Sequence, residues 1–117
     1  MHHDPKIHDC IQLCCECRTE CQETLTHHCL EMGGKHVAKE HVLLMIDCIQ
    51  ACQTAADFMT RGSSLHSAEC AACAAVCEAC AHSCEQVGGE EMMRCAEVCR
   101  RCAQSCREMS QQMEPAE

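Results

Sequence analysis

Small and apolar residues recur at every third or fourth position along most of the chain, with Glu, Gln, Arg, His and Ser between them. An α-helix turns by about 100° per residue, so this spacing puts the apolar positions on one helical face. The alternating apolar and polar residues typical of strands do not occur in the sequence. The pattern therefore predicts an all-α protein.

Turn residues divide the pattern into four segments. Paired glycines stand at 33–34 and 88–89, and the stretch RGSS occupies 61–64. These residues end helices because glycine readily adopts the positive φ angles that follow a last helical turn. The segments between them are rich in helix formers, and helices are expected over about 5–32, 36–60, 65–87 and 90–113. Residues 1–117 thus predict a single domain, an antiparallel up-down-up-down four-helix bundle.

Cysteine stands where a bundle would normally carry leucine. The chain has 17 cysteines in 117 residues, far above the usual share. Most of them follow the three-or-four spacing and form one narrow stripe per helix, so the bundle is expected to have a cysteine-lined core. The cysteines on the stripes are Cys10, Cys14, Cys17, Cys21, Cys48, Cys52, Cys70, Cys73, Cys77, Cys80, Cys84, Cys95, Cys99, Cys102 and Cys106.

Two cysteines do not follow the stripes. Cys15 is rotated from its stripe by about 100° or more and is expected on a flank or at an interface. Cys29 is also rotated, and His28 would continue the stripe in a regular helix. A local distortion of the helix could turn Cys29 inward, so Cys29 is included among the candidate ligands.

Disulfides and simple packing explain the stripes poorly. Neighbours three or four residues apart on a helix have Cβ atoms about 5–6 Å apart, whereas a disulfide needs about 3.8 Å. Bridges within a helix would therefore distort it, while bridges between helices stay open, above all after oxidation in air. Free cysteine can act as a small hydrophobe. However, cysteine and alanine are too small to fill a bundle that has one Phe and neither Trp nor Tyr. Dense free thiols instead indicate a metal site.

Monovalent copper fits this ligand pattern best. Thiolates and thioethers favour Cu(I), Zn(II) and iron–sulfur clusters. The C-x2-C-x2-C run of iron–sulfur proteins does not occur in the sequence, and structural zinc sites group four ligands, usually on loops. One Cu(I) neutralises one thiolate, so a filled interior carries little net charge. The sequence predicts multiple Cu(I) ions per chain.

Methionine and histidine extend the stripes towards both ends of the bundle. On the second helix, His41, Met45 and Met59 keep the spacing of the two cysteines, while His66 precedes Cys70 by four residues and Met109 follows Cys106 by three. One end would collect Cys10, Met59, His66 and Met109, and we expect the metal to enter there. The opposite end would collect Cys21, His41, Cys84 and Cys95. His27, His28, His36 and His82 are expected to be solvated or to lie outside the ligand shell.

The net charge, the hydropathy and the first residues argue against nucleic acid as a partner and against a membrane location. The formal net charge is −9, which repels phosphate backbones and anionic lipid, so no nucleic acid is expected as a partner. No run of about 18 apolar residues occurs, so no membrane span is expected. The first residues lack the apolar stretch of a signal peptide, and a cytoplasmic protein is expected.

The stripes resemble those of the cysteine-rich four-helix-bundle copper storage proteins, and most closely those of their cytosolic branch. The resemblance rests on CIQLCCECRTEC, CIQACQTAADFM, CAACAAVCEACAHSC and CAEVCRRCAQSCREM. It implies many Cu(I) ions along the inside of the bundle, bound by the stripe cysteines, an open end for metal uptake, and a homotetramer. The chain departs from the family's pattern in its first two helices, where the second offers only two cysteines.

Three functions stay open on these residues. The leading one is storage or sequestration of Cu(I), with copper chaperones or acceptor enzymes as possible partners. A second is a general thiol buffer for Zn(II) or Cd(II). A third is a redox protein, although its attacking thiol would normally be exposed near a helix N-terminus. No acid–base pair or activated nucleophile stands out, so the protein is not expected to be an enzyme.

Overall fold

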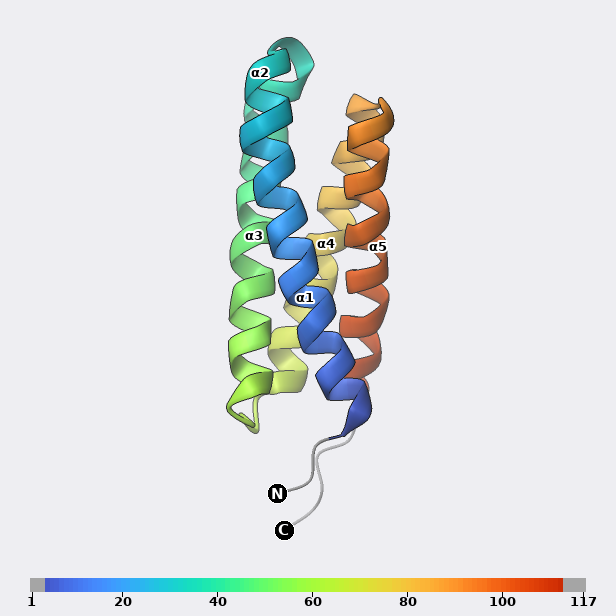
Figure 1. The fold of residues 1–117 in the computed structure, drawn as a ribbon. Coiled ribbons are helices and arrows are strands. Elements are labelled where there is room, and N and C mark those ends of the chain that lie inside the picture. Colours follow the sequence, from blue (N-terminus) through green and yellow to red (C-terminus); the bar gives the residue numbers. More distant parts are fainter. Residues whose placement is uncertain (1–3, 113–117) are drawn as a thin grey trace.

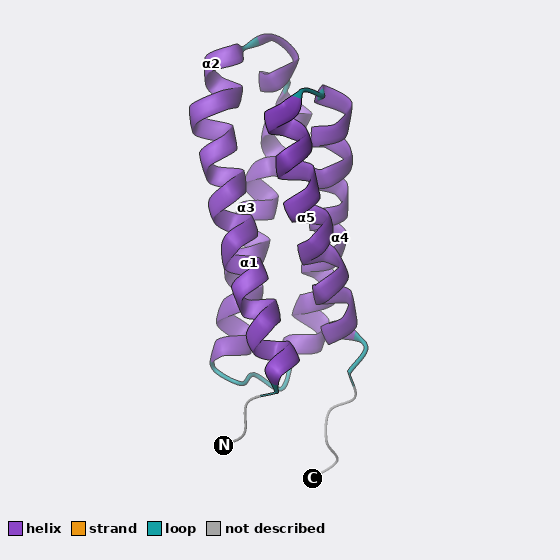
Figure 2. Cartoon of the chain, turned by 45° about the vertical axis from the view of Figure 1, so that its right-hand side comes forward, coloured by secondary structure: helices purple, strands orange, loops and turns teal. Residues whose placement is uncertain are grey.

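The chain folds as a bundle of long antiparallel helices, in a computed structural model that describes residues 4–112 (Figures 1 and 2). Its elements are α1 (Pro5–Thr24), η1 (Leu25–Cys29), α2 (Leu30–Met32), η2 (Gly34–Val37), α3 (Lys39–Thr60), α4 (His66–Val87) and α5 (Glu90–Ser110). The first three form one continuous helical rod. The rod and α4 each pack against both α3 and α5, which confirms the predicted all-α four-helix bundle.

Local signals set the helix ends close to the expected positions. The Asp4 carboxylate caps α1 by accepting a hydrogen bond of 2.9 Å from the Lys6 backbone N–H. Gly88 and Gly89 have φ angles of 81° and 96°, which lets two residues turn the chain from α4 into α5. The second long helix begins at Lys39 rather than near residue 36, because the 3-10 turn η2 precedes it. The last ends at Ser110, and residue 113 lies outside the described residues.

The helical rod formed by α1, η1 and α2 contains a π-helical turn, η1, which turns the side chain of Cys29 towards the core. In a regular α-helix, eight residues from Cys21 to Cys29 would leave the two side chains about 80° apart. In η1 the Leu30 backbone N–H bonds to the Leu25 carbonyl, five residues back. This wider turn takes up one extra residue, so Cys29 lies about where the seventh residue would, only about 20° from Cys21. The distortion expected for Cys29 is confirmed.

The core is a column of cysteine sulfur. The stripe cysteines are completely buried, as is Cys29. The largest fully buried side chains are three methionines, Met45, Met92 and Met109. Alanines such as Ala55 and Ala81 let the helices approach closely around this narrow core. The cysteine-lined interior predicted from the stripes is therefore what the fold contains.

One described helix, α3, is long and apolar enough to cross a membrane by length and composition alone. The same helix forms one wall of the bundle and buries seven side chains, including Met45, Cys48 and Cys52. In this helix 33% of the apolar window is buried inside the bundle, and a single helix of this kind is weak evidence for a membrane span.

Candidate metal centre

The cysteines of the chain divide into a buried set and a single exposed residue. Among the 17 cysteines, Cys15 is exposed and the other sixteen are buried, and all have free thiols. Cys15 directly follows Cys14 on α1 but points to the outside, as its rotation predicted. The sequence therefore separated the inward thiols correctly from the outward one.

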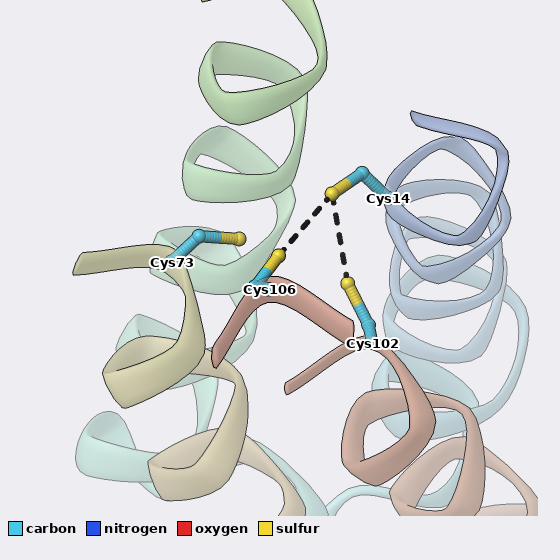
Figure 3. Close-up of side chains that lie close together, drawn as sticks. All are labelled: Cys14, Cys73, Cys102 and Cys106. Carbon is cyan, nitrogen blue, oxygen red and sulfur yellow. Dashed lines mark hydrogen bonds between the residues drawn. The ribbon is translucent and has the colours of Figure 1, made fainter. Parts of the chain in front are cut away.

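Buried sulfurs from all four long helices meet in groups of four. Four such groups have ligand atoms within 4.8 Å of one another, and each consists of buried cysteines only. The groups are Cys14, Cys73, Cys102 and Cys106; Cys17, Cys21, Cys48 and Cys99; Cys17, Cys48, Cys52 and Cys77; and Cys52, Cys73, Cys77 and Cys102. Figure 3 shows the first group, with the Cys14 sulfur 3.5 Å from that of Cys106 and 3.8 Å from that of Cys102.

Neighbouring groups share their cysteines. Cys52 belongs to two groups and has sulfur contacts with Cys77 at 3.6 Å and with Cys73 and Cys102 at 3.9 Å. Cys48 also belongs to two groups, and so do several other cysteines. Separate four-coordinate sites would need a private set of thiolates each. The shared sulfurs instead form one continuous network in which a thiolate can bridge two metal ions.

The sulfur spacing suits a bound metal before any metal arrives. A metal–sulfur bond of about 2.3 Å separates two sulfurs by about 3.8 Å in a tetrahedral site and about 4.0 Å in a trigonal one. The shortest sulfur–sulfur distances in the column lie between 3.5 and 4.0 Å, and all sulfurs of one group lie within 4.8 Å of one another. The helices therefore hold the thiols at coordination distance from shared points on the bundle axis. Small shifts of side chains are enough to form metal–sulfur bonds.

Burial and mutual hydrogen bonding control the protons on these thiols. Hydrogen bonds from Cys17 and Cys21 lower the pKa of Cys48, while the bonds of Cys52 with Cys102 and Cys14 raise the pKa of Cys52. A hydrogen bond with Cys21 lowers the pKa of Cys80 to about 7. Once one thiolate has formed, it disfavours the ionisation of its neighbours. Most of the column therefore stays protonated without metal, and metal binding must release protons.

A different ligand set closes the column at the end where η1 lies. The Cys29 sulfur is 3.7 Å from His41 Nε2, 3.7 Å from the Met92 sulfur and 4.0 Å from the Met45 sulfur. We call Cys29, His41, Met45 and Met92 the mixed cluster. Burial is the main cause that lowers the pKa of His41, so its imidazole is neutral and can bind a metal. Burial also raises the pKa of Cys29 to about 11.

The ligand set predicted from the sequence contains neither Met92 nor Met45, although Met45 keeps the spacing of its stripe. Met92 precedes Cys95 by three residues, the same spacing that links the stripe cysteines. Extending the α5 stripe by one step towards its N-terminus would have found it. Its contact with Cys29 was not predictable, because it depends on the π-helical turn.

The opposite end holds the residues predicted to form the entrance. Met59 and Met109 are only 5% and 1% exposed, and the Cys10 sulfur lies 3.7 Å from that of Cys106. His66 is half-buried at the start of α4, with its Nδ1 3.1 Å from the Ser63 carbonyl oxygen. The hydrogen bond of Cys70 with Cys10 raises the pKa of Cys70. The antiparallel fold puts the helix termini that carry these residues at the same end of the bundle (Figure 1).

The predicted ligand Cys84 and the outer histidines differ in their burial. Cys84 is buried near the α4–α5 turn, where its hydrogen bond with Cys80 raises the Cys84 pKa. His27 and His82 are exposed, as expected for solvated histidines. His36 is different, because it is buried, and its ring meets the His28 ring edge-on with centroids 5.1 Å apart. His36 is therefore not solvated, but it belongs to none of the sulfur groups, which agrees with the expectation that it lies outside the ligand shell.

Comparison with protein families agrees with the sulfur column. The sequence profile of the copper storage protein family matches residues 3–111. The chain belongs to the copper storage protein family. This confirms the resemblance seen in the cysteine stripes, and the matched range contains the residues of the column and of the mixed cluster.

Solved structures of similar chains share the whole bundle. The copper storage protein BsCsp3 in its Cu(I)-bound form is 31% identical, with a TM-score of 0.83, covering 90% of this chain and 98% of that one. The apo form of the Bacillus subtilis protein is 32% identical, with a TM-score of 0.79 and coverages of 88% and 97%. The Nitrosospira multiformis protein Nmul_A1745 is 44% identical, with a TM-score of 0.88 and coverages of 92% and 97%. No curated protein sequence matches the chain.

Proposed function

We propose that this protein stores Cu(I) in the cytoplasm by binding many ions per chain along the inside of its bundle. The observation that carries this proposal is the continuous network of shared, buried thiols. Storage needs many equivalent soft ligands in one protected space, and a network of bridging thiolates supplies them. The Cu(I)-bound form of BsCsp3, a relative with the same fold, supports copper as the cargo.

Charge favours Cu(I) over divalent metals in this space. A Zn(II) ion with four private thiolates keeps a charge of about −2, which is costly to bury. Cu(I) and thiolate in equal numbers are neutral, so filling the column adds no buried net charge. Ion pairs between described arginines and glutamates lie on the outside of the bundle, as between Arg100 and Glu85 at 2.8 Å. The surface charges are therefore poorly placed to compensate charged sites on the axis.

A general thiol buffer for Zn(II) or Cd(II) is the second candidate. The sulfur spacings suit a tetrahedral metal as well as a trigonal one, so geometry alone does not separate the two. Competition does: we expect Cu(I) to displace Zn(II) completely and to bind in larger number. A thiol redox function is a weaker candidate, because the buried cysteines are mid-helix and inward, whereas an attacking thiol has to be reachable.

The cellular setting follows from the same residues. Sixteen buried thiols stay reduced most easily in a reducing compartment, which favours the cytoplasm. The ions would be exchanged with copper chaperones or acceptor enzymes. The family resemblance implies a homotetramer, and two apolar side chains one turn apart on α3, Leu43 and Ile46, are 47% and 45% exposed where a second copy could cover them.

The decisive experiment is an anaerobic titration of reduced protein with Cu(I) against a competing chelator. We expect tight binding of on the order of one Cu(I) per buried stripe thiol. Saturation at one or two ions would contradict storage and would favour a chaperone or a sensor.

Two serine variants provide a matched pair for this titration. The Cys48 sulfur contacts those of Cys17, Cys21 and Cys77 at 3.8 Å and that of Cys99 at 4.0 Å. Cys48→Ser should therefore lower the capacity by at least one ion, because several bridges lose a common thiolate. Cys15→Ser removes the exposed thiol and should leave the capacity unchanged. Equal capacities in the two variants would show that the column does not hold the metal.

A further inference from the structure

A groove on the side of the bundle leads to the mixed cluster. It lies between α3 and α4, beside η2, and has a volume of about 470 Å³, within the range of small-molecule sites. Lys35, His41, Leu44, Ala79, His82 and Ser83 are among the residues that line it. The groove therefore has an apolar wall and an exposed histidine, His82. It also contains His41, which belongs to the mixed cluster, and Ser83, which contacts His41.

His41 separates this groove from the sulfur column. The residue lines the groove and is only 4% exposed, while its Nε2 lies 3.7 Å from the Cys29 sulfur. A metal ion on the Nε2 side would lie among the sulfurs of Cys29, Met45 and Met92. The imidazole is thus the group that an ion would meet between the surface and the column.

Ser83 sets the direction of the His41 ring. His41 Nδ1 lies 2.8 Å from the Ser83 hydroxyl oxygen. When that oxygen accepts the Nδ1 hydrogen, Nε2 carries the free lone pair and faces Cys29. Metal-binding histidines are commonly fixed in this way through their second nitrogen. Ser83 reaches His41 from α4, so the hydrogen bond also joins the two helices that border the groove.

We infer that this lateral groove is the port through which Cu(I), carried by a low-molecular-weight thiol, reaches the mixed cluster, with Ser83 as the positioning residue of His41. The inference rests on the proposed storage function and specifies its route. The lining residues Lys35 and Glu40 carry opposite charges, which suits a small zwitterionic carrier such as a thiol peptide.

The transfer itself is a ligand exchange without redox change. The bond between Cu(I) and the carrier sulfur breaks, and bonds form from Cu(I) to His41 Nε2 and to the Cys29 sulfur. The proton of the Cys29 thiol passes to the carrier thiolate, which leaves as a neutral thiol. Copper stays monovalent, and the total charge is unchanged. The methionine sulfurs add neutral, weaker ligands, so the ion can move on to the thiolates of the column.

The first test blocks the groove without touching a ligand. Ala79→Trp adds bulk to the groove wall, and Ala75→Trp adds the same bulk to an exposed position one turn away on α4 that does not line it. We expect uptake from a Cu(I)–glutathione complex to slow by about tenfold in Ala79→Trp, with unchanged final capacity. Ala75→Trp should match the unmodified protein. Equal uptake rates in the two variants would overturn the port.

The second test removes one oxygen atom, so it stays decisive even if the tryptophan variant folds poorly. Ser83→Ala should weaken binding of the first Cu(I) ion by about tenfold, and Ser83→Thr should restore it. Nitrogen NMR of the imidazole separates positioning from a merely structural role. The His41 Nε2 signal should shift when Cu(I) binds, and the Nδ1–H signal should weaken in Ser83→Ala. Unchanged signals and affinity would refute the role of Ser83.

The predicted entrance at the opposite end gives an independent comparison. If Cu(I) enters there, alanine variants of Met59, His66 and Met109 will slow uptake while Ala79→Trp will not, and the lateral port is wrong. A failure of storage itself looks different: the unmodified protein would then bind only one or two ions. Full capacity with equal rates in all groove variants refutes the port alone.

Discussion

At the scale of single residues, burial decides which thiols can take part in binding. Cys14 and Cys15 are neighbours in sequence, yet one is buried in the column and the other is exposed. Within the bundle, desolvation favours the neutral thiol, and burial is the main cause that raises the pKa of Cys29 from 9.0 to about 11. A buried thiol therefore gives up its proton readily only when a metal ion replaces it.

This shift predicts how the stability of the metal-free protein depends on pH. Below pH 9 the Cys29 thiol is protonated in both the folded and the unfolded chain, so its full contribution is present. Between pH 9 and 11 the unfolded chain loses this proton while the folded chain keeps it, so the free energy of unfolding falls. Urea unfolding of the reduced protein across this range should show a smaller fall in Cys29→Ser than in Cys15→Ser. Parallel curves would refute the assignment.

At the scale of elements, the π-helical turn η1 decides whether the first helix can complete the metal centre. Without it, eight α-helical residues would rotate Cys29 out of line with Cys21. With it, the Cys29 sulfur meets His41 of α3 and Met92 of α5. The extra residue within the helix thus joins three elements at one end of the bundle.

Removing the extra residue tests this explanation. Deleting the exposed His27 should convert the turn to a regular α-helix and leave Cys29 seven residues from Cys21, still facing inward. We expect a folded bundle with the same Cu(I) capacity. Deleting the exposed Gln12 of α1 should instead rotate Cys10, the one stripe cysteine that precedes it, by about 100° and lower the capacity. The measurements are circular dichroism and Cu(I) titration, and a lost capacity in the His27 deletion would contradict the register argument.

At the scale of the whole molecule, the bundle combines an acidic exterior with a neutral sulfur interior. The sequence has a net charge of −9, and described acidic residues such as Glu85 and Glu16 lie on the outer faces, where they pair with arginines. The protonated column is apolar enough to be buried as a core. We therefore expect the bundle to form without metal and metal bonds to strengthen it.

Loading should accordingly raise stability without creating the fold. Reduced, metal-free protein should already give the circular dichroism spectrum of a helical bundle, and its unfolding temperature should rise with each added Cu(I) equivalent because only the folded chain offers the preformed column. A random-coil spectrum without metal would contradict the preformed bundle. About one proton should be released per thiolate formed, measured in weakly buffered solution.

The sequence by itself determined the class of fold and most of the residues of the candidate metal centre. The three-or-four spacing places the stripe cysteines on one helical face by geometry alone, and the glycine turns make consecutive helices antiparallel. Only the tertiary structure decided which sulfurs meet, because contacts such as Cys14 with Cys106 join residues far apart in sequence. It also decided that Cys29 turns inward, that His36 is buried and that Ser83 holds His41. These features depend on helix register and on packing between helices, which periodicity within one helix does not contain.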